Sequence, residues 1–405
     1  MQKKLSSLIT VVLFLIMLTA PTLLYFTVGE NTENALDEKR ALAGMPESFH
    51  NAYLQDIEKW YNDHAPYRIS LITFLLEQTQ KYSAAYRSKI RPALSALMTP
   101  SWYNEEYKQW AGIKEPYLAP MEDYLVNYGR EDWLYYTGDN SIGFFTGSNL
   151  LDPEEMVKWG EAFQELQKCC EAKGIRLVYF VPPNKEQVYP EYMASYRIEN
   201  LPKREEIINE YMQQKGLPFT YGLEVLKSHK TDRTIYYKQD SHWNEIGAFA
   251  ATMKIYEMLG MPVTALEDIE VRNTKKTGGD LSNFCGYATT YPDYDVIYKP
   301  EVSYTFESYR DGYIEIFHSD SENEHNLVLI GDSMRNGNKD YLARDFRQST
   351  ILFRNYIEEP EVTEALLALK EGDVLLLQIG ERHDQAIYDV TQYLLGLLQE
   401  QNGNK

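Results

Sequence analysis

The sequence predicts an α/β fold in which helices cover both faces of a mostly parallel β-sheet. Short apolar runs of strand length alternate with amphipathic helical patterns, the order typical of parallel sheets. Several of these runs are apolar without interruption, as expected for strands buried on both faces. Three of them, at residues 175–181, 327–330 and 374–379, run directly into polar loops. Because ligands bind at the carboxyl ends of strands in such sheets, these loops are the first place to look for a site.

The chain begins with a predicted membrane anchor. Leu8–Val28 carries no charge over about 20 residues, which matches the thickness of a hydrocarbon core. Lys3 and Lys4 precede this run and Glu30 and Glu33 follow it, so the remainder is expected outside the cytoplasm. The predicted location is the plasma membrane, with one pass and an extracytoplasmic main domain. A cleaved signal peptide is the alternative, and it would also export the protein.

Three regions are expected along the chain. Residues 1–29 form a cytoplasmic stub and the transmembrane anchor, residues 30–125 a helical and linker region, and residues 126–405 the α/β domain. In the second region, helical patterns are visible at Tyr53–Tyr61 and Ser70–Tyr82.

Helices of the α/β domain are predicted from capping signals and from apolar residues at three- and four-residue spacing. Asp152, followed by Pro153 and two glutamates, is a typical helix start, and Gly174 is expected to end that helix. Asn244 is expected to cap another helix, which places His242 just before its amino terminus. Two further helices are predicted at Glu205–Gln214 and Tyr388–Leu398.

Strands are predicted from apolar or β-prone runs bounded by turn residues. The run Leu327–Ile330 stops at Gly331–Asp332–Ser333, which leaves the Ser333 hydroxyl at a strand end. Gly-Asp-Ser is also common as a simple turn. The observation that argues for a catalytic role is the pair Asp240 and His242 upstream, a carboxylate and an imidazole two positions apart. The other predicted strands are Asp132–Tyr136, Ile175–Val181, Thr234–Tyr237, Tyr313–Phe317, Thr350–Phe353 and Val374–Ile379.

Composition narrows the possible partners. The 405 residues are 44% hydrophobic and 25% charged, which is ordinary for a globular protein. A formal net charge of -20 repels a phosphate backbone and argues against a nucleic-acid partner. Cys169, Cys170 and Cys285 imply neither a disulfide framework nor a metal site. The 33 tyrosines could stack on sugars, or they could simply be amphipathic filler of the core.

Asp240 and His242 supply what Ser333 needs to become a nucleophile. A serine hydroxyl reacts when a base takes its proton, and the base needs a third group that orients it. Two residues apart in extended backbone, Asp240 and His242 point the same way, so the carboxylate can accept from Nδ1–H while Nε2 faces Ser333. Metal binding by this pair is a competing hypothesis, but no third ligand stands at a diagnostic spacing, so no metal is expected.

An acyl-transfer site also needs donors for the oxyanion. The backbone N–H of Ser333 is one candidate. The polar loop after the strand at Ile175–Val181 contributes a further candidate for substrate contact. The side-chain candidates for the oxyanion or the substrate are Arg335, Asn336, Arg354, Asn355, Tyr356 and Lys185.

These residues carry a family resemblance. Gly331–Asp332–Ser333 resembles the nucleophile block of SGNH-type hydrolases, and Asp240–Ser241–His242–Trp243 resembles the signature of DHHW and AlgX/AlgJ-like proteins. In that family the Asp-x-His pair precedes the serine, as it does here. Weaker similarities extend over most of the chain after the anchor, at Asp63–Arg68, Trp133–Tyr135, Pro183–Lys185, Val188–Pro190, Gly279–Leu281 and Glu381–Arg382.

The resemblance implies an SGNH-hydrolase-like (flavodoxin-like) domain that O-acetylates a cell-surface or exported polysaccharide. Ser333 would be the nucleophile, His242 the base and Asp240 the orienting residue, with no cofactor. A membrane-bound O-acyltransferase would supply the acyl group. The alternatives are a carbohydrate esterase with the same triad and a catalytically inactive polysaccharide-binding scaffold.

The chain departs from the family pattern in three ways. Ser241 stands at the second position of the Asp-His-His-Trp signature, between the two triad members. The Gly and Asn oxyanion blocks of ordinary SGNH enzymes have no convincing copy here. The segment after His383 is too short for the carbohydrate-binding module of AlgX-like members, so a glycan would be held by the main groove or by a partner.

Overall fold

The computed structural model describes residues 56, 60, 89–199, 202–298 and 303–403. The chain divides into two compact units, residues 1–90 and 91–405, and the description below concerns the second. The anchor predicted at Leu8–Val28 lies outside the described residues, as do the helices predicted at Tyr53–Tyr61 and Ser70–Tyr82 apart from the helical positions Asp56 and Trp60. Among the helices that the structure describes, none combines the length and apolarity needed to span a bilayer.

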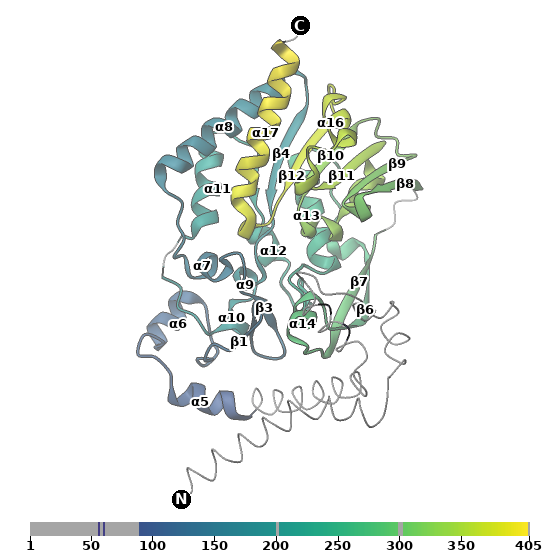
Figure 1. The fold of residues 1–405 in the computed structure, drawn as a ribbon. Helices are drawn as coiled ribbons and strands as arrows, with labels where there is room; N and C mark the ends of the chain where they lie inside the picture. Colours follow the sequence, from purple (N-terminus) through teal and green to yellow (C-terminus); the bar gives the residue numbers. More distant parts are fainter. Residues whose placement is uncertain (1–55, 57–59, 61–88, 200–201, 299–302, 404–405) are drawn as a thin grey trace, which may run out of the picture. The chain divides into compact units, whose positions relative to one another are not determined.

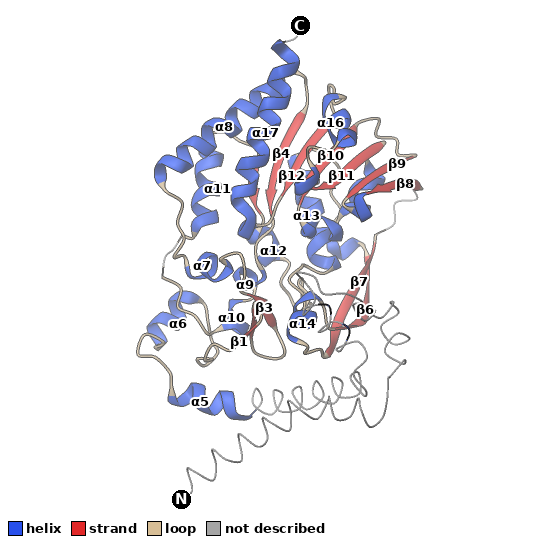
Figure 2. Cartoon of the chain, viewed as in Figure 1, coloured by secondary structure: helices blue, strands red, loops and turns tan. Residues whose placement is uncertain are grey.

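A seven-stranded, mostly parallel sheet forms the centre of the second unit, as predicted (Figure 2). Its spatial order is β5-β4-β12-β10-β11-β9-β8, and the first five strands are parallel. β9 pairs antiparallel with β11, and β8 antiparallel with β9. The strands span Phe219–Tyr221 (β5), Arg176–Val181 (β4), Val374–Gln378 (β12), Asn326–Gly331 (β10), Gln348–Phe353 (β11), Ile314–Ser319 (β9) and Tyr304–Tyr309 (β8).

Helices cover both faces of this sheet, which confirms the predicted α/β class (Figure 1). On one face, Tyr179 of β4 stacks on Phe163 of α8 with ring centroids 4.7 Å apart. On the other, Arg176 of the same strand donates to the Leu259 carbonyl at the end of α13 (2.8 Å). The first layer contains α8 (Pro153–Ala172), α11 (Arg204–Gln214) and α17 (Asp384–Gly403), and the second contains α13 (Glu245–Met258) and α15 (Lys339–Asp345).

The two predicted helix caps are present. The Asp152 carboxylate accepts from the backbone N–H of Glu154 (2.8 Å) at the start of α8. The Asn244 side-chain oxygen accepts from the N–H groups of Ile246 (3.1 Å) and Gly247 (3.2 Å) at the start of α13. Because Asn244 fixes where α13 begins, it also fixes the loop that immediately precedes the helix.

Shorter elements surround the sheet. The remaining helices are α5 (Arg91–Leu97), α6 (Glu105–Ala111), α7 (Ser141–Thr146), α9 (Lys185–Val188), α10 (Pro190–Met193), α12 (Leu223–Ser228), α14 (Asp280–Cys285) and α16 (Pro360–Leu367). Single 3₁₀ turns occur at η2 (Leu266–Asp268), η3 (Arg310–Gly312), η4 (Ser333–Gly337), η5 (Arg354–Tyr356) and η6 (Glu381–His383).

Three differences from the predicted strands are informative. The strand expected at Asp132–Tyr136 is the shorter β3 (Leu134–Tyr136), which belongs to a separate antiparallel sheet with β1 (Glu122–Asp123) and β2 (Val126–Tyr128). Thr234–Tyr237 is not a strand, since Tyr236 makes only an isolated bridge to Trp243. The ribbon of β6 (Glu270–Thr277) and β7 (Thr290–Ile297) was not predicted, because β6 is polar and largely exposed and has no apolar periodicity.

The strand register brings three loops to one edge of the sheet. Gly331, the last residue of β10, lies opposite Phe353 of β11 and Gln378 of β12. Because all three strands are parallel, the loops that follow them leave from the same edge, with the turn that carries Ser333 in the middle. A buried amide pair holds this turn, since Asn338 Nδ2 donates to Gln378 Oε1 (2.9 Å) and Gln378 Nε2 donates to Asn338 Oδ1 (3.2 Å).

We expect Asn338→Ala to lower the free energy of unfolding by about 1–3 kcal/mol, because it leaves the Gln378 amide buried without partners. Urea titration monitored by tryptophan fluorescence measures the change. The double variant Asn338→Leu with Gln378→Met removes both amides at similar volume and should recover part of the loss. An equal or larger loss in the double variant would contradict the role of the amide pair.

Candidate active site

Ser333 is held by the residue before it. The Asp332 carboxylate accepts from the backbone N–H groups of Met334 (3.0 Å) and Gly380 (2.8 Å) and from His383 Nδ1 (3.1 Å). Burial alone would raise the pKa of the Asp332 carboxyl, but the His383 hydrogen bond and charge outweigh it and keep this pKa well below its usual range. The ionised carboxylate therefore ties the turn after β10 to the loop after β12.

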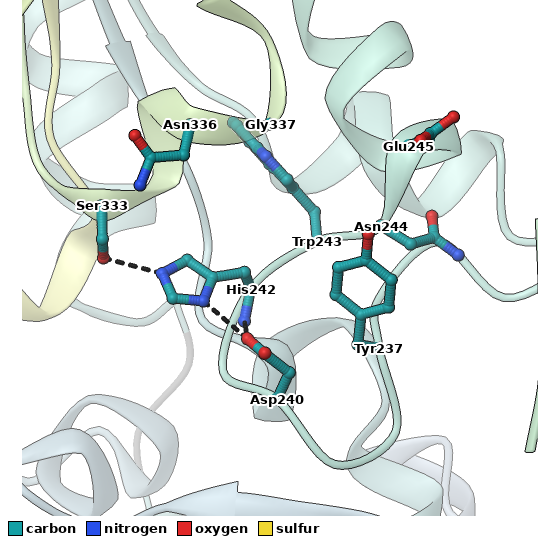
Figure 3. A pocket seen from close by; sticks show the side chains of 9 residues that line it. All are labelled: Tyr237, Asp240, His242, Trp243, Asn244, Glu245, Ser333, Asn336 and Gly337. Carbon is teal, nitrogen blue, oxygen red and sulfur yellow. Dashed lines mark hydrogen bonds and ion pairs between the residues drawn. The ribbon is translucent and has the colours of Figure 1, made fainter. Parts of the chain in front are cut away.

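His242 and Asp240 approach Ser333 from the loop before α13. Asp240 Oδ1 accepts from His242 Nδ1 (2.6 Å) and from the His242 backbone N–H (3.1 Å). His242 Nε2 lies 2.7 Å from Ser333 Oγ (Figure 3). Burial raises the pKa of the Asp240 carboxyl, but the hydrogen bond and charge of His242, helped by Lys276, bring it well below the usual range. The structure thus brings together the three residues predicted as a triad, in one hydrogen-bonded line.

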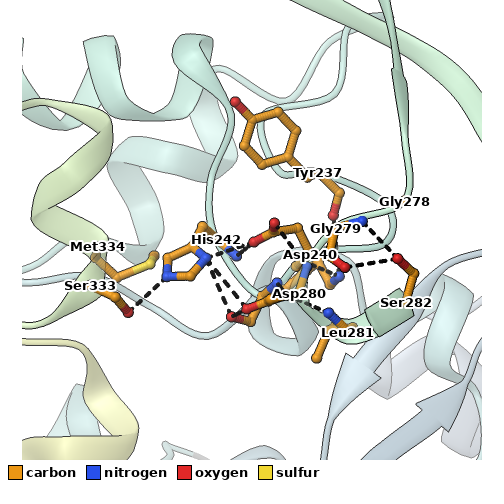
Figure 4. Close-up of polar contacts among 12 residues, drawn as sticks. Tyr237, Asp240, His242, Gly278, Gly279, Asp280, Leu281, Ser282, Ser333 and Met334 are labelled. Carbon is orange, nitrogen blue, oxygen red and sulfur yellow. Dashed lines mark hydrogen bonds and ion pairs between the residues drawn. The ribbon is translucent and has the colours of Figure 1, made fainter. Parts of the chain in front are cut away.

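A second carboxylate, Asp280, supports this line (Figure 4). Its Oδ2 lies 3.6 Å from His242 Nδ1, and its backbone N–H donates to Asp240 Oδ2 (3.2 Å). Its two oxygens also accept from the backbone N–H (2.7 Å) and the hydroxyl (2.5 Å) of Ser241. A Cβ on Gly279 would meet the Asp240 Cβ at 2.5 Å, so only glycine fits beside the triad carboxylate. In the sequence, the signals at this place are a turn cluster and the family motif Gly279–Leu281, and neither assigns Asp280 a role beside His242.

The same groups could be considered for a metal ion, since ligand atoms of Asp240, His242 and Asp280 lie within 4.8 Å of one another. However, both imidazole nitrogens of His242 already face hydrogen-bond partners, and both Asp280 oxygens accept from Ser241. A metal would have to displace these bonds. The arrangement fits an oriented histidine better than a metal centre.

Lys185 does not lie where a substrate contact was predicted. The residue is 2% exposed, and Nζ donates to the carbonyls of Tyr237 (3.2 Å), Lys238 (3.1 Å) and Asp240 (2.7 Å). Burial lowers the pKa of the Lys185 ammonium to about 7, against the opposing effect of the Asp280 and Asp240 charges. Lys185 is therefore a positioning residue that holds the triad loop through its backbone carbonyls.

The predicted oxyanion candidates separate into two groups. Asn336 lines the hollow at Ser333, whereas Arg335 is buried behind it and donates from Nη1 to Asn336 Oδ1 (3.2 Å). With the amide oxygen engaged by Arg335, the amide nitrogen lies on the Ser333 side in Figure 3. The other three candidates follow β11 in the η5 turn and are not among the lining residues of this hollow: Arg354, Asn355 and Tyr356.

The hollow itself has a volume of about 190 Å³. Trp243 lines the hollow next to Gly337. A Cβ at position 337 would lie 2.4 Å from Trp243 Nε1. Any side chain at position 337 would push the Ser333 turn away from the His242 loop. The complete lining is Tyr237, Asp240, His242, Trp243, Asn244, Glu245, Ser333, Asn336 and Gly337.

A family model described as the SGNH hydrolase-like domain of the acetyltransferase AlgX matches residues 126–355, more than half of the chain. The chain belongs to this family. The membership confirms the resemblance inferred from the Gly-Asp-Ser and Asp-x-His-Trp motifs. No curated protein matches the sequence.

Several solved structures are similar to this AlgX-family chain. A DHHW family protein from Eubacterium siraeum is 14% identical, with 68% of this chain and 97% of that chain covered and a TM-score of 0.45. PatB1 from Bacillus cereus is 16% identical, with 65% and 96% covered and a TM-score of 0.46. The O-acetyltransferase domain of AlgJ from Pseudomonas putida is 12% identical, with 68% and 99% covered and a TM-score of 0.42.

We expect Lys185→Met to change how stability depends on pH. An unfolded lysine keeps its proton up to about pH 10.4, but the folded one only to about pH 7. Between these values the unfolded state binds more protons, so this residue makes the free energy of unfolding rise with pH. Denaturant titrations from pH 7 to 10 should show a smaller rise in the variant. An unchanged slope would mean that Lys185 is charged in the folded protein.

Proposed function

We propose that the protein is an extracytoplasmic O-acetyltransferase that modifies a cell-surface or exported polysaccharide through an acetyl-Ser333 intermediate. The observation that carries the proposal is the hydrogen-bonded line from Asp240 through His242 to Ser333, in a chain of the AlgX acetyltransferase family. The anchor predicted at Leu8–Val28 would hold the domain at the plasma membrane. A membrane-bound O-acyltransferase would donate the acetyl group to Ser333 of this domain.

In the first half-reaction, Ser333 Oγ attacks the acetyl carbonyl while His242 Nε2 takes its proton. A C–O bond forms, and the carbonyl oxygen becomes an oxyanion. Asp240 stabilises the imidazolium through Nδ1–H and keeps the ring in the correct tautomer. The intermediate then collapses, the donor's leaving group takes the proton from His242, and acetyl-Ser333 remains.

In the second half-reaction, a sugar hydroxyl gives its proton to His242 Nε2 and attacks the acetyl-serine carbonyl. The new sugar ester forms as the bond to Ser333 Oγ breaks, and the serine recovers its proton from His242. The Asn336 amide nitrogen, aimed toward Ser333 by the Arg335 bond to the amide oxygen, would donate to the oxyanion in both halves. Arg335 would then act on the reaction through Asn336.

Hydrolysis by the same triad is the second candidate function. His242 is only partly buried, with 26% of its side chain exposed, so water can reach the base that would activate a sugar hydroxyl. The esterase reading differs from the transferase reading only in the final acceptor. The complete Asp240–His242–Ser333 line counts against an inactive scaffold.

We expect Ser333→Ala to lower turnover of an aryl acetate by about 10³-fold or more and to abolish acetylation of the protein, because the nucleophile is lost. Asp240→Asn should lower turnover by about 10²- to 10⁴-fold, since the amide favours the wrong imidazole tautomer. Release of the aryl alcohol gives the rate, and intact-protein mass spectrometry detects the acetyl group. Acetylation of the Ser333→Ala variant at the parental level would remove Ser333 from the mechanism.

The products of the parental protein distinguish transfer from hydrolysis. Acetylated oligosaccharide among the products supports transfer, and free acetate alone supports the esterase.

We expect Asn336→Ala to lower kcat by about 10²- to 10³-fold through loss of an oxyanion donor. Asn355→Ala is the matched control, because Asn355 is exposed and does not line the hollow at Ser333, and it should behave like the parent protein. Equal rates in the two variants would show that the oxyanion is stabilised by other groups.

A further inference from the structure

A second hollow continues from the one at Ser333. The two share Tyr237, Glu245, Asn336 and Gly337 in their linings, so they form one groove that leads away from the triad. The second hollow has a volume of about 330 Å³ and is completed by Val296, Ile297, Tyr298, Asp340, Tyr341 and Arg344. We call the combined space the acceptor groove. The six residues that line only the second hollow take no part in activating Ser333, so this hollow calls for a separate explanation.

Aromatic side chains in the acceptor groove are held rigidly before any ligand binds. Tyr298 and Tyr341 meet edge to face, with ring centroids 5.9 Å apart. Both also pack edge to face on Phe249, at 5.4 and 5.9 Å. Tyr237, at the junction of the two hollows, has the Lys276 ammonium 3.2 Å from its ring centroid, and its hydroxyl points away from Asp240 in Figure 3. Rings fixed in this way can receive the apolar C–H face of a sugar with little further loss of side-chain entropy.

The charged groups of the acceptor groove disfavour a polyanion. Its lining acids are Asp240, Glu245 and Asp340, and its lining cation is Arg344. Lys276, beside Tyr237, is paired with the Asp240 carboxylate (3.8 Å). Arg344 donates from Nη1 to the Tyr298 carbonyl (3.1 Å) and lies over the Tyr304 ring (5.7 Å), and its single positive charge is outnumbered by the three lining carboxylates. The whole chain has a net charge of -20. A uronate or phosphate polymer would therefore meet repulsion along its length.

We propose that the acceptor groove binds the glycan to be acetylated and that this glycan is a chain of uncharged sugars. Sugar rings would stack on Tyr237 and Tyr298, and their hydroxyls would donate to the carboxylates of Glu245 and Asp340. The hydroxyl that receives the acetyl group would lie at the His242 end, beside Asn336. This inference rests on the proposed acetyltransferase function and adds the class of acceptor to it.

Binding can be measured apart from chemistry on the full-length Ser333→Ala variant in detergent. Calorimetric titration with cellohexaose, mannohexaose, hexa-N-acetylchitohexaose and hexagalacturonate compares uncharged and anionic chains of equal length. We expect at least one uncharged hexasaccharide to bind roughly tenfold or more tightly than hexagalacturonate. Adding Tyr298→Ala should weaken that binding by about 2- to 10-fold. Tyr211→Ala is the matched control, since this half-buried tyrosine lies on α11 at the opposite face of the sheet, and it should leave binding unchanged.

A charge change tests the same inference without removing a packed side chain. Asp340 is exposed, so Asp340→Lys should leave the fold intact and should raise the affinity for hexagalacturonate, with the gain disappearing at high salt. The inference is overturned if hexagalacturonate binds at least as tightly as every uncharged chain before this change, if no uncharged chain binds, or if neither Tyr298→Ala nor Asp340→Lys alters binding.

The two proposals fail in different ways. If Ser333 becomes acetylated in the parental protein but the binding pattern is absent, the groove assignment is wrong and the acyl-transfer function stands. If the binding pattern is present but Ser333 never carries an acyl group, the groove binds uncharged glycans and the acyl-transfer function is wrong.

Discussion

The candidate active site depends on one close approach, between Trp243 and the turn that contains Ser333. Trp243 is 1% exposed, and its indole leaves no room for a side chain at Gly337. A single hydrogen bond between His242 and Ser333 contributes only about 1 kcal/mol and would not hold two loops together by itself. Packing beneath the two loops sets their separation, and the 2.7 Å contact between His242 Nε2 and Ser333 Oγ follows from it.

Hydrogen bonds from acidic and basic side chains then fix the orientation of each loop against a different part of the fold. Asp332 joins the Ser333 turn to the loop after β12, and Asp280 joins the triad loop to the start of α14. Lys185 also holds the triad loop, because its Nζ donates hydrogen bonds to three carbonyls of that loop. Charge-assisted hydrogen bonds are stronger and more directional than neutral ones. This suits a site that must hold His242 within hydrogen-bond distance of both Asp240 and Ser333.

The chemistry and the acceptor groove meet at Asn336. On one side its amide faces Ser333, where negative charge would develop in the proposed reaction, and on the other it lines the path that a glycan would follow. The same turn can therefore present the acyl group and the attacking hydroxyl to one base. In the proposed reaction, the occupant of the groove would decide whether water or sugar receives the acetyl group, because the triad is identical in both reactions.

The sequence alone determined the elements whose signals are local. Continuous apolar runs predicted the central strands β4, β10, β11 and β12, and the caps Asp152 and Asn244 predicted two helix starts. The hydrogen-bonded line of Asp240, His242 and Ser333 was predictable too, because the first two lie two residues apart and Ser333 stands at a strand end. Local signals failed for β6, whose residues are polar and exposed, and for Thr234–Tyr237, where β propensity is not met by a pairing strand.

Only the tertiary structure decided the roles of the long or remote side chains. Lys185 and Arg335 looked like substrate contacts, yet each turns inward to acceptors supplied by residues that the fold brings near. Asp280 lies next to His242 because the β6–β7 ribbon and α14 fold back over the triad loop. A side chain that can extend over several ångströms takes its role from the partners within its reach, and those partners are set by packing between segments distant in the chain.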